Sequence, residues 1–427
     1  MKFIPTNFRR TNLIISIIAI VTIAIASVLF ENHRQMAAIF TVPFFSGAAN
    51  TGIGQPWQCA PEEVSKYKLL STEQKESYKF SSYPPSSLIN YNHYNAGFVY
   101  LIIVAKQIFF WKGDIQALKA FHVLMHIIIC LLIISVIERK TFKFLFLLCY
   151  GLNPLVIYFV TFPYLYFWQV LPSFAIAVVL LQNKPLRIGQ FLLLATVCAL
   201  AFVVRPTVIL AVLFLFFLLF TINKRYTLLV SLTGFLTVFL WLWTPAGNKT
   251  IWHTAYVGIG AYENPYMQGV TDNNAFALFK KKTGQNLYLY PGGNYYDSTT
   301  FAANVRILKT EYLKIAKQIP LLLLRNAFLN FFQGFSIGYL LDYPMWTNYL
   351  SMAAGLVFFI LLVINRLYKW IIAIALTNLS FSVYFPPIPA YMFGSYLLLV
   401  SAFIVLLQKN ADTINNLTGR IKKAVST

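Results

Sequence analysis

Apolar runs and short polar segments alternate along most of the chain. A helix needs about 20 mostly apolar residues to cross the hydrocarbon of a bilayer, and twelve runs approach that length. They cover residues 12–30, 95–111, 116–137, 144–162, 166–181, 187–204, 207–222, 227–244, 320–341, 347–365, 370–385 and 388–407. The pattern predicts an all-α integral membrane protein.

The basic residues between the runs indicate how many runs span the membrane. Cytoplasmic loops carry an excess of Lys and Arg. If all twelve runs span, the basic clusters fall on both sides of the membrane, which conflicts with this rule. If 95–111 and 320–341 do not span, about ten transmembrane helices remain and every short basic cluster lies on one side. These clusters are Arg9–Arg10, Arg139–Lys140 with Lys143, Lys184 with Arg187, Lys224–Arg225, Arg366 with Lys369, and the segment from Lys409. Both termini are then cytoplasmic.

The two excluded runs also differ from the others in composition. Gly97 and Lys106 interrupt run 95–111, while run 320–341 contains Arg325, three amides and two glycines. Such residues are typical of an amphipathic helix that lies at the membrane surface. A half-inserted span is the alternative for either run.

The resulting chain is a single polytopic membrane domain, residues 1–427, with two large outer loops. The first loop covers 31–119 and the second 245–347, and residues 408–427 form a cytoplasmic tail. Six of the 13 acidic residues lie in the first outer loop and five in the second. Because carboxylates are so scarce elsewhere, their concentration indicates that the chemistry takes place on the outer side.

Composition supports this interpretation. The sequence is 58% hydrophobic and 11% charged, whereas soluble domains are about 25% charged. The net charge of +21 would indicate a nucleic-acid partner in a soluble protein, but basic cytoplasmic loops account for it here, and we expect none. Run 12–30 is too long for a signal peptide and has a poor cleavage site, which favours a retained first helix. There is no CxxC or Cys/His metal spacing.

The first outer loop contains two groups of candidate functional residues. Glu62 and Glu63 are adjacent carboxylates, one of which would serve as a general base; acidic residues in the first turn of a helix are the alternative. Asn92, His93 and Asn95 lie among tyrosines, and such side chains suit hydrogen bonding and stacking on a sugar. Interfacial tyrosines are, however, common in membrane proteins.

The second outer loop is dense in groups that bind hydroxylated ligands. Trp252, His253, Tyr262 and Asn264 precede Asp272, a further candidate base. A structural histidine and an Asx turn at Asp272 are the alternatives.

Two arginines are candidates for binding phosphate. Arg205 lies at the outer end of a predicted span and Arg325 in the second surface helix, and arginine suits bidentate phosphate contacts. Snorkelling toward the interface is the alternative. His122 and His126 are four residues apart in a span, but no third ligand is evident, so polar packing is favoured and no metal site is predicted.

Several segments resemble the GT-C superfamily of polyprenyl-phosphate-sugar-dependent glycosyltransferases, in particular bacterial relatives of the protein O-mannosyltransferases. Pro61–Tyr67 is similar to the family's acidic P-D-E-x-x-x-Y motif, and Trp111–Lys119 to its F-G-x-x-x-x-A-x-R corner. Residues 91–100 occupy the place of its surface-helix opening, and Asn153-Pro154-Leu155, Arg205-Pro206-Thr207 and Trp252–Asp272 also look familiar. The chain departs from the pattern at Glu62, where Asp is usual, and at Lys119 and Ala390, where Arg is usual.

The resemblance implies a glycosyltransferase of the bacterial cytoplasmic membrane. The enzyme would transfer a sugar, with inversion, from a polyprenyl-phosphate donor to a glycan, lipid or protein acceptor at the outer face. Glu62 or Glu63 would be the base, with Asp272 second, and Arg205 and Arg325 would hold the donor phosphate. Membrane lipids are further partners, no other cofactor is expected, and participation of a divalent metal is left open. The alternatives are an O-antigen polymerase or ligase and, in another class, a transporter or lipid flippase.

Overall fold

The computed structural model describes residues 10–31, 41–90, 95, 97–182, 188–222, 251–288, 293–336 and 346–425. Helices make up about 79% of this part of the chain. The strands β1 (Gln58–Cys59) and β2 (Ile89–Asn90) pair antiparallel, with Gln58 opposite Asn90. The predicted all-α class is confirmed, and the long exposed apolar faces of the helices agree with a membrane protein.

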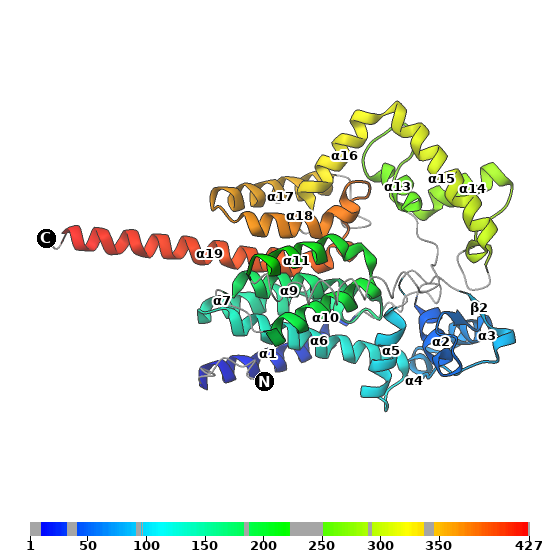
Figure 1. The fold of residues 1–427 in the computed structure, drawn as a ribbon, viewed down its shortest axis with the longest axis horizontal. Coiled ribbons are helices and arrows are strands. Elements are labelled where there is room, and N and C mark those ends of the chain that lie inside the picture. Colours follow the sequence, from blue (N-terminus) through cyan, green and yellow to red (C-terminus); the bar gives the residue numbers. More distant parts are fainter. Residues whose placement is uncertain are drawn as a thin grey trace.

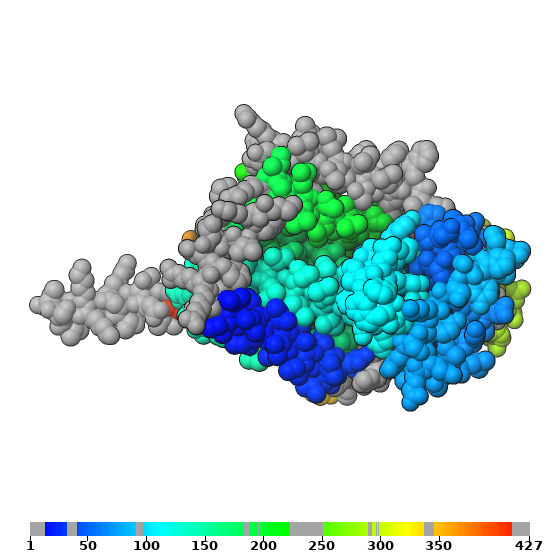
Figure 2. All heavy atoms as spheres, turned by 90° about the horizontal axis from the view of Figure 1, so that it is seen from below, coloured from blue at the N-terminus to red at the C-terminus, as the bar shows by residue number. Residues whose placement is uncertain are grey.

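A bundle of helices with a common direction forms the body of the molecule (Figure 1). Its members are α1 (Arg10–Leu29), α6 (Asp114–Val136), α7 (Lys140–Phe146), α8 (Pro154–Val160), α9 (Val170–Leu181), α10 (Ile188–Val204), α11 (Ile209–Ile222), α17 (Trp346–Ile364), α18 (Tyr368–Ser382) and α19 (Pro389–Val425). Seen from below, α1 lies on the surface of this bundle (Figure 2).

Proline and asparagine interrupt several apolar runs. Asn153 caps α8 by accepting a hydrogen bond from the Leu155 backbone N–H at 2.9 Å. Pro154 follows at the first helical position, where its missing N–H costs nothing. The π-helical turn η3 (Leu147–Gly151) precedes this cap, and the two helical pieces meet at 57°. The 3-10 turns η4 (Leu165–Gln169) and η5 (Pro206–Val208) likewise precede α9 and α11.

These interruptions matter for the number of spans. Among the described residues, three helices are long and apolar enough to cross a membrane: Asp114–Val136, Trp346–Ile364 and Pro389–Ala411. The bent pair of α7–η3 and α8 makes a fourth if it counts as one span. The structure therefore does not support the predicted ten spans, because hydropathy measures the length of an apolar run and not the continuity of its helix. Run 227–244 lies outside the described residues.

Two outer regions lie at one end of the bundle, opposite the start of α1 and the end of α19 (Figure 1). The first comprises α2 (Val42–Asn50), η1 (Thr51–Ile53), β1, α3 (Pro61–Leu69), α4 (Thr72–Ser77), η2 (Pro85–Ser87), β2 and α5 (Gly97–Ile108). The second comprises α13 (Trp252–Gly258), η6 (Ile259–Ala261), α14 (Asp272–Thr283), η7 (Asn294–Tyr296), α15 (Ser298–Gln318) and α16 (Pro320–Gln333).

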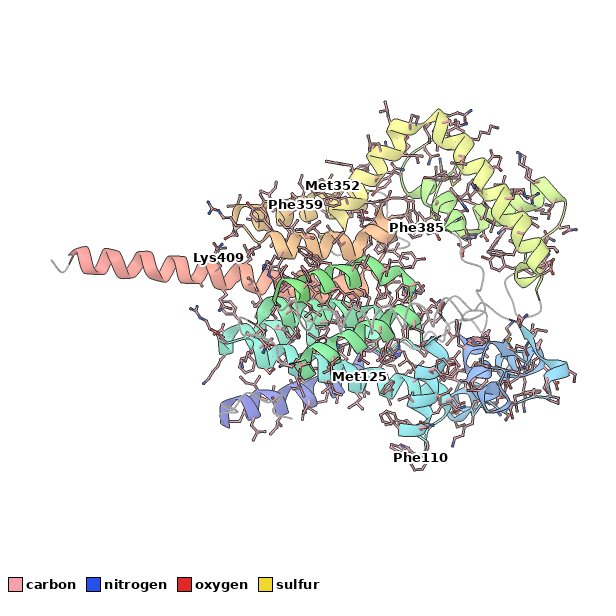
Figure 3. The ribbon with its side chains drawn as sticks, viewed as in Figure 1. Phe110, Met125, Met352, Phe359, Phe385 and Lys409 are labelled. Carbon is pink, nitrogen blue, oxygen red and sulfur yellow. The ribbon has the colours of Figure 1, made fainter. Side chains whose placement is uncertain are left out.

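The predicted surface helices are shorter than the apolar runs that contain them. At a rise of about 1.5 Å per residue, α5 and α16 extend about 18 and 21 Å, less than the ~30 Å of membrane hydrocarbon. Phe110 follows α5 and points away from the ribbon (Figure 3), and both it and Trp111 are exposed. Aromatic side chains of this kind are enriched at the membrane–water interface. Helix α19 continues to Val425, through most of the predicted tail.

Close backbone approaches join the second outer region to the bundle. A Cβ on Gly355 of α17 would lie 1.8 Å from the Phe332 backbone oxygen of α16. A Cβ on Gly258 of α13 would lie 2.1 Å from the Tyr384 backbone oxygen, just after α18. Only glycine permits contacts this short, so these two positions fix α16 and α13 against the bundle.

Candidate active site at the outer end of the bundle

Arg205 lies where α10 ends at the outer end of the bundle. Its guanidinium carbon is 5.0 Å from the ring centre of Tyr166 and 5.2 Å from that of Tyr391. The side-chain Nε donates to the Thr207 hydroxyl at 3.2 Å. Within the described residues, no carboxylate lies within 4 Å of this guanidinium. An arginine that lies over two tyrosine rings, and that has no carboxylate within 4 Å among the described residues, is suited to bind an anion.

A chain of aromatic rings connects Arg205 to the first outer region. The Tyr166 ring lies 5.0 Å from Tyr164, and Tyr164 lies 6.2 Å from Phe44 of α2 and 6.0 Å from Phe98 of α5. The first outer region is therefore connected to the arginine through Tyr164 and Tyr166.

The second outer region places a carboxylate near the same tyrosines. Asp272 is the first residue of α14, after the N-cap Thr271, and its side chain is 54% exposed. Its negative charge makes a minor contribution to the electrostatics of Tyr166 and Tyr391, the two rings over which Arg205 lies. Arg205 and Asp272, 67 residues apart in sequence, thus both act electrostatically on the same tyrosine pair.

His253 is the direct partner of Asp272. Its Nε2 lies 3.0 Å from Asp272 Oδ1, and its side chain is 18% exposed. The Asp272 charge also reaches Tyr295, whose pKa is raised to about 12, chiefly by burial and secondarily by this carboxylate. The arrangement combines an accessible carboxylate, an imidazole that orients it, and a nearby arginine.

The carboxylate pair in the first outer region divides into two environments. Glu62 is exposed on α3, whereas Glu63 is fully buried. Glu63 Oε1 accepts the Ser81 backbone N–H at 2.7 Å. Burial raises the pKa of Glu63, and the hydrogen bond from Ser81 opposes this rise. Glu63 therefore anchors the segment after α4 rather than facing solvent.

Sequence reasoning missed a partly buried ion pair that acts on Glu63. Lys106 Nζ of α5 lies 2.7 Å from Asp114 Oδ2 of α6, and the same oxygen accepts the Phe80 backbone N–H at 2.9 Å. Both charges act on the Glu63 carboxyl, Lys106 lowering its pKa and Asp114 raising it. Two features of the sequence could have indicated this pair: a lysine inside an apolar run, and an acidic residue at the start of the next helix.

Lys119, the last residue of the predicted corner, also forms an ion pair with a carboxylate. Its Nζ lies 2.7 Å from Glu31 Oε1, just after α1. The pair therefore joins the end of α1 to α6.

Arg325 lies apart from Arg205, on the exposed side of α16. Its Nη2 donates to the Glu263 backbone oxygen at 3.2 Å and to Asn326 Oδ1 at 3.0 Å. The guanidinium carbon lies 5.9 Å from the Tyr262 ring centre. Tyr262 itself is buried, and its hydroxyl donates to Asn330 Oδ1 at 2.8 Å. The structure thus places Arg325 and Tyr262 together.

The remaining predicted binding residues have mixed surroundings. The Asn264 amide nitrogen is within 2.9 Å of the backbone oxygens of Ile259, Tyr262 and Met267, which commits this side chain to its own loop. The Trp252 ring lies 5.4 Å from Lys309 Nζ. Asn95 is buried. Asn92 and His93 lie outside the described residues.

The two histidines of α6 make packing contacts. The Trp168 indole donates to His122 Nε2 at 3.1 Å, so His122 Nδ1 donates to the Val160 backbone oxygen at 3.2 Å. His126 Nε2 lies 3.1 Å from the Gly151 backbone oxygen. Both nitrogens of His122 are therefore occupied. No cluster of three or more metal-ligating side chains exists within the described part of the chain.

No family model and no curated protein matches the chain. A solved structure with a similar arrangement is the archaeal oligosaccharyltransferase AglB from Archaeoglobus fulgidus, in complex with an inhibitory peptide and a dolichol-phosphate. The two share 12% identity with a TM-score of 0.42. The match covers 96% of this chain and 52% of that chain, so the protein spans about half the length of this structure. Nothing about the site follows from so distant a similarity.

Proposed function

We propose that the protein is a GT-C-like membrane glycosyltransferase that transfers a sugar from a polyprenyl-phosphate donor at the outer end of its bundle. The observation that carries this proposal is Arg205, whose guanidinium lies over the rings of Tyr166 and Tyr391, together with the exposed Asp272–His253 pair of the second outer region at the same end of the bundle (Figure 1). A cation for phosphate and a carboxylate for a hydroxyl proton are the two groups that such a transfer requires.

The reaction is a single displacement at the anomeric carbon of the sugar. The acceptor hydroxyl oxygen forms the new bond to this carbon while the bond to the phosphate oxygen breaks. Asp272 receives the hydroxyl proton, and polyprenyl phosphate leaves as an anion held by Arg205. Inversion at the anomeric carbon follows from attack opposite the leaving group.

Accessibility separates the candidate bases. A general base must come within hydrogen-bond reach of the acceptor, and Asp272 is half exposed while Glu63 is fully buried. We therefore assign Asp272 as the base and Glu63 as a residue that positions the first outer region. Glu62 is exposed on α3 and is the second candidate. Arg325, on the neighbouring face of α16, would contact the acceptor or the headgroup layer.

The test is transfer of radiolabelled sugar from a native lipid extract by the purified protein. We expect Asp272→Asn to lower the rate by about 100-fold or more, as typical for loss of a general base, and Glu63→Gln to retain most activity. Normal transfer by Asp272→Asn together with loss in Glu62→Gln would move the base to α3. Absence of transfer from any lipid pool, with transport of a lipid or solute in liposomes, would replace the enzyme with a transporter.

A further inference from the structure

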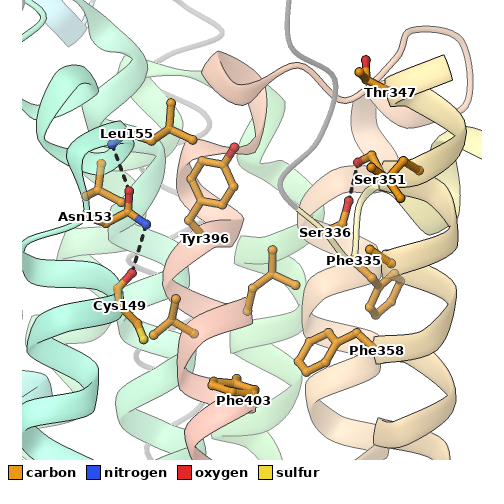
Figure 4. Close-up of a pocket in the computed structure, with 15 residues that line it drawn as sticks. Cys149, Asn153, Leu155, Phe335, Ser336, Thr347, Ser351, Phe358, Tyr396 and Phe403 are labelled. Atoms are coloured by element: carbon orange, nitrogen blue, oxygen red, sulfur yellow. Dashed lines mark hydrogen bonds between the residues drawn. The ribbon is translucent and has the colours of Figure 1, made fainter. Parts of the chain in front are cut away.

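An intramembrane pocket opens between α8, α17 and α19, with a volume of about 590 Å³ (Figure 4). This volume lies within the range of small-ligand sites in proteins. Phe358 of α17 and Phe403 of α19 line its inner half. The inner half therefore offers hydrocarbon contacts.

Polar side chains gather at the opposite, outer half of the pocket. Ser351 lies near the start of α17, and its hydroxyl is 2.5 Å from the hydroxyl of Ser336, which follows α16. The Tyr396 hydroxyl points toward the same end (Figure 4). No charged side chain occurs among the described residues that line the pocket. The described lining of the pocket is thus amphipathic and carries no charge.

The pocket opens toward the surface that the bilayer covers. Leu350 and Phe403 line it and are 60% and 38% exposed. Farther along α17, Val357 and Ile364 are also exposed. An apolar helix face of this kind is covered by lipid chains in a membrane. The molecules that can enter the pocket from the side are therefore lipids.

We propose that this pocket binds the chain of an uncharged, hydroxyl-bearing membrane lipid of the diacylglycerol class, with its polar group at Ser336, Ser351 and Tyr396. The chain lies against Phe358 and Phe403. The described rim residues offer no cation, so a phosphate placed against them would lose water without gaining a positive partner.

This pocket is distinct from the site at Arg205. Tyr391 and Tyr396 are five residues apart on α19, which at about 100° per residue separates them by about 140° around the helix. Tyr391 faces Arg205 and Tyr396 faces the pocket. The lipid site therefore does not depend on the proposed transfer reaction.

Photolabelling tests the proposal in the full-length protein. The protein is placed in phosphatidylethanolamine nanodiscs with a diacylglycerol that carries a diazirine near the chain end, and labelled peptides are mapped by mass spectrometry. A phosphatidylglycerol probe with the same chains is the headgroup control. We expect the diacylglycerol to label the peptides of α17 and α19 that contain Phe358 and Phe403, and the anionic probe to label them about tenfold less.

Two adjacent alanines of α17 provide matched variants. Ala354 lines the pocket, whereas Ala353 is exposed on α17 outside it. We expect Ala354→Phe to reduce labelling about tenfold, which corresponds to the loss of about two buried methylene contacts, and Ala353→Phe to leave it unchanged. Competition by unlabelled dioctanoylglycerol in the unmodified protein gives a readout that needs no variant. Equal labelling of both variants, equal labelling by the anionic probe, or absence of competition would each overturn the proposal.

Discussion

Replacement of Arg205 by glutamine removes the cation between Tyr166 and Tyr391 while keeping a side chain of similar reach. Nε is engaged by the Thr207 hydroxyl, and no described residue is paired with either Nη group, so these groups can contact a phosphate. Each hydrogen bond to a charged group contributes about 1.5–3 kcal/mol. A glutamine amide retains one donor group but no charge, so we expect a loss of about 3 kcal/mol, or about 100-fold in affinity.

The assay is binding of a fluorescent short-chain polyprenyl phosphate to purified protein, compared with the polyprenol that lacks the phosphate. Arg306→Gln is the matched control, because Arg306 is exposed on α15 and away from the tyrosine pair. Arg205→Lys separates charge from geometry: it keeps the positive charge but loses the planar fork, so we expect an intermediate loss of about tenfold.

Binding of the phosphate by Arg205→Gln within about threefold of the unmodified protein would refute the reasoning, since less than about 1 kcal/mol would then come from the guanidinium. An equal loss for polyprenol would also refute it, because polyprenol offers no phosphate to the arginine. A preserved thermal midpoint in both variants shows that the comparison concerns binding and not folding.

Three further outcomes concern stability and are measured as thermal unfolding midpoints of the purified protein. Burial raises the pKa of Glu63, so its contribution to stability is full below the ordinary carboxyl pKa and is lost as pH rises through the raised value. From pH 5 to 8 the unmodified protein should therefore lose stability relative to Glu63→Gln. Parallel plots of the unfolding midpoint against pH for the two proteins would contradict this. Lys106→Met leaves the Asp114 side chain, 3% exposed, without its cation. Because Lys106 is partly exposed, we expect a loss of about 2–3 kcal/mol in the free energy of unfolding. The added substitution Asp114→Asn should recover most of this loss. Gly355→Ala places a Cβ 1.8 Å from a backbone oxygen and should lower the stability by about 1–3 kcal/mol. Gly189→Ala is the control, because a Cβ at Gly189 meets no atom within 4 Å, and it should leave the stability unchanged.

The candidate site shows how far sequence reasoning reaches. Arg205, His253 and Asp272 were found because charged and polar groups are rare in so apolar a chain. Their convergence could not be predicted, since it depends on Tyr166 and Tyr391, which come from two different helices. Glu63 was also selected because acidic residues are rare in this chain. The sequence does not distinguish a carboxylate that faces solvent from a buried one that accepts the Ser81 backbone N–H.

The sequence by itself determined the all-α class and the two polar outer regions, because hydrocarbon and water impose opposite compositions on the segments they contact. It also separated the runs 187–204 and 207–222 at Pro206, since proline lacks the N–H that helix continuation needs. Only the tertiary structure decided how many runs form continuous spans and which distant charges meet. The Lys106–Asp114 pair and the Arg205 cluster arise from packing between helices, and packing depends on contacts that no local pattern of residues records.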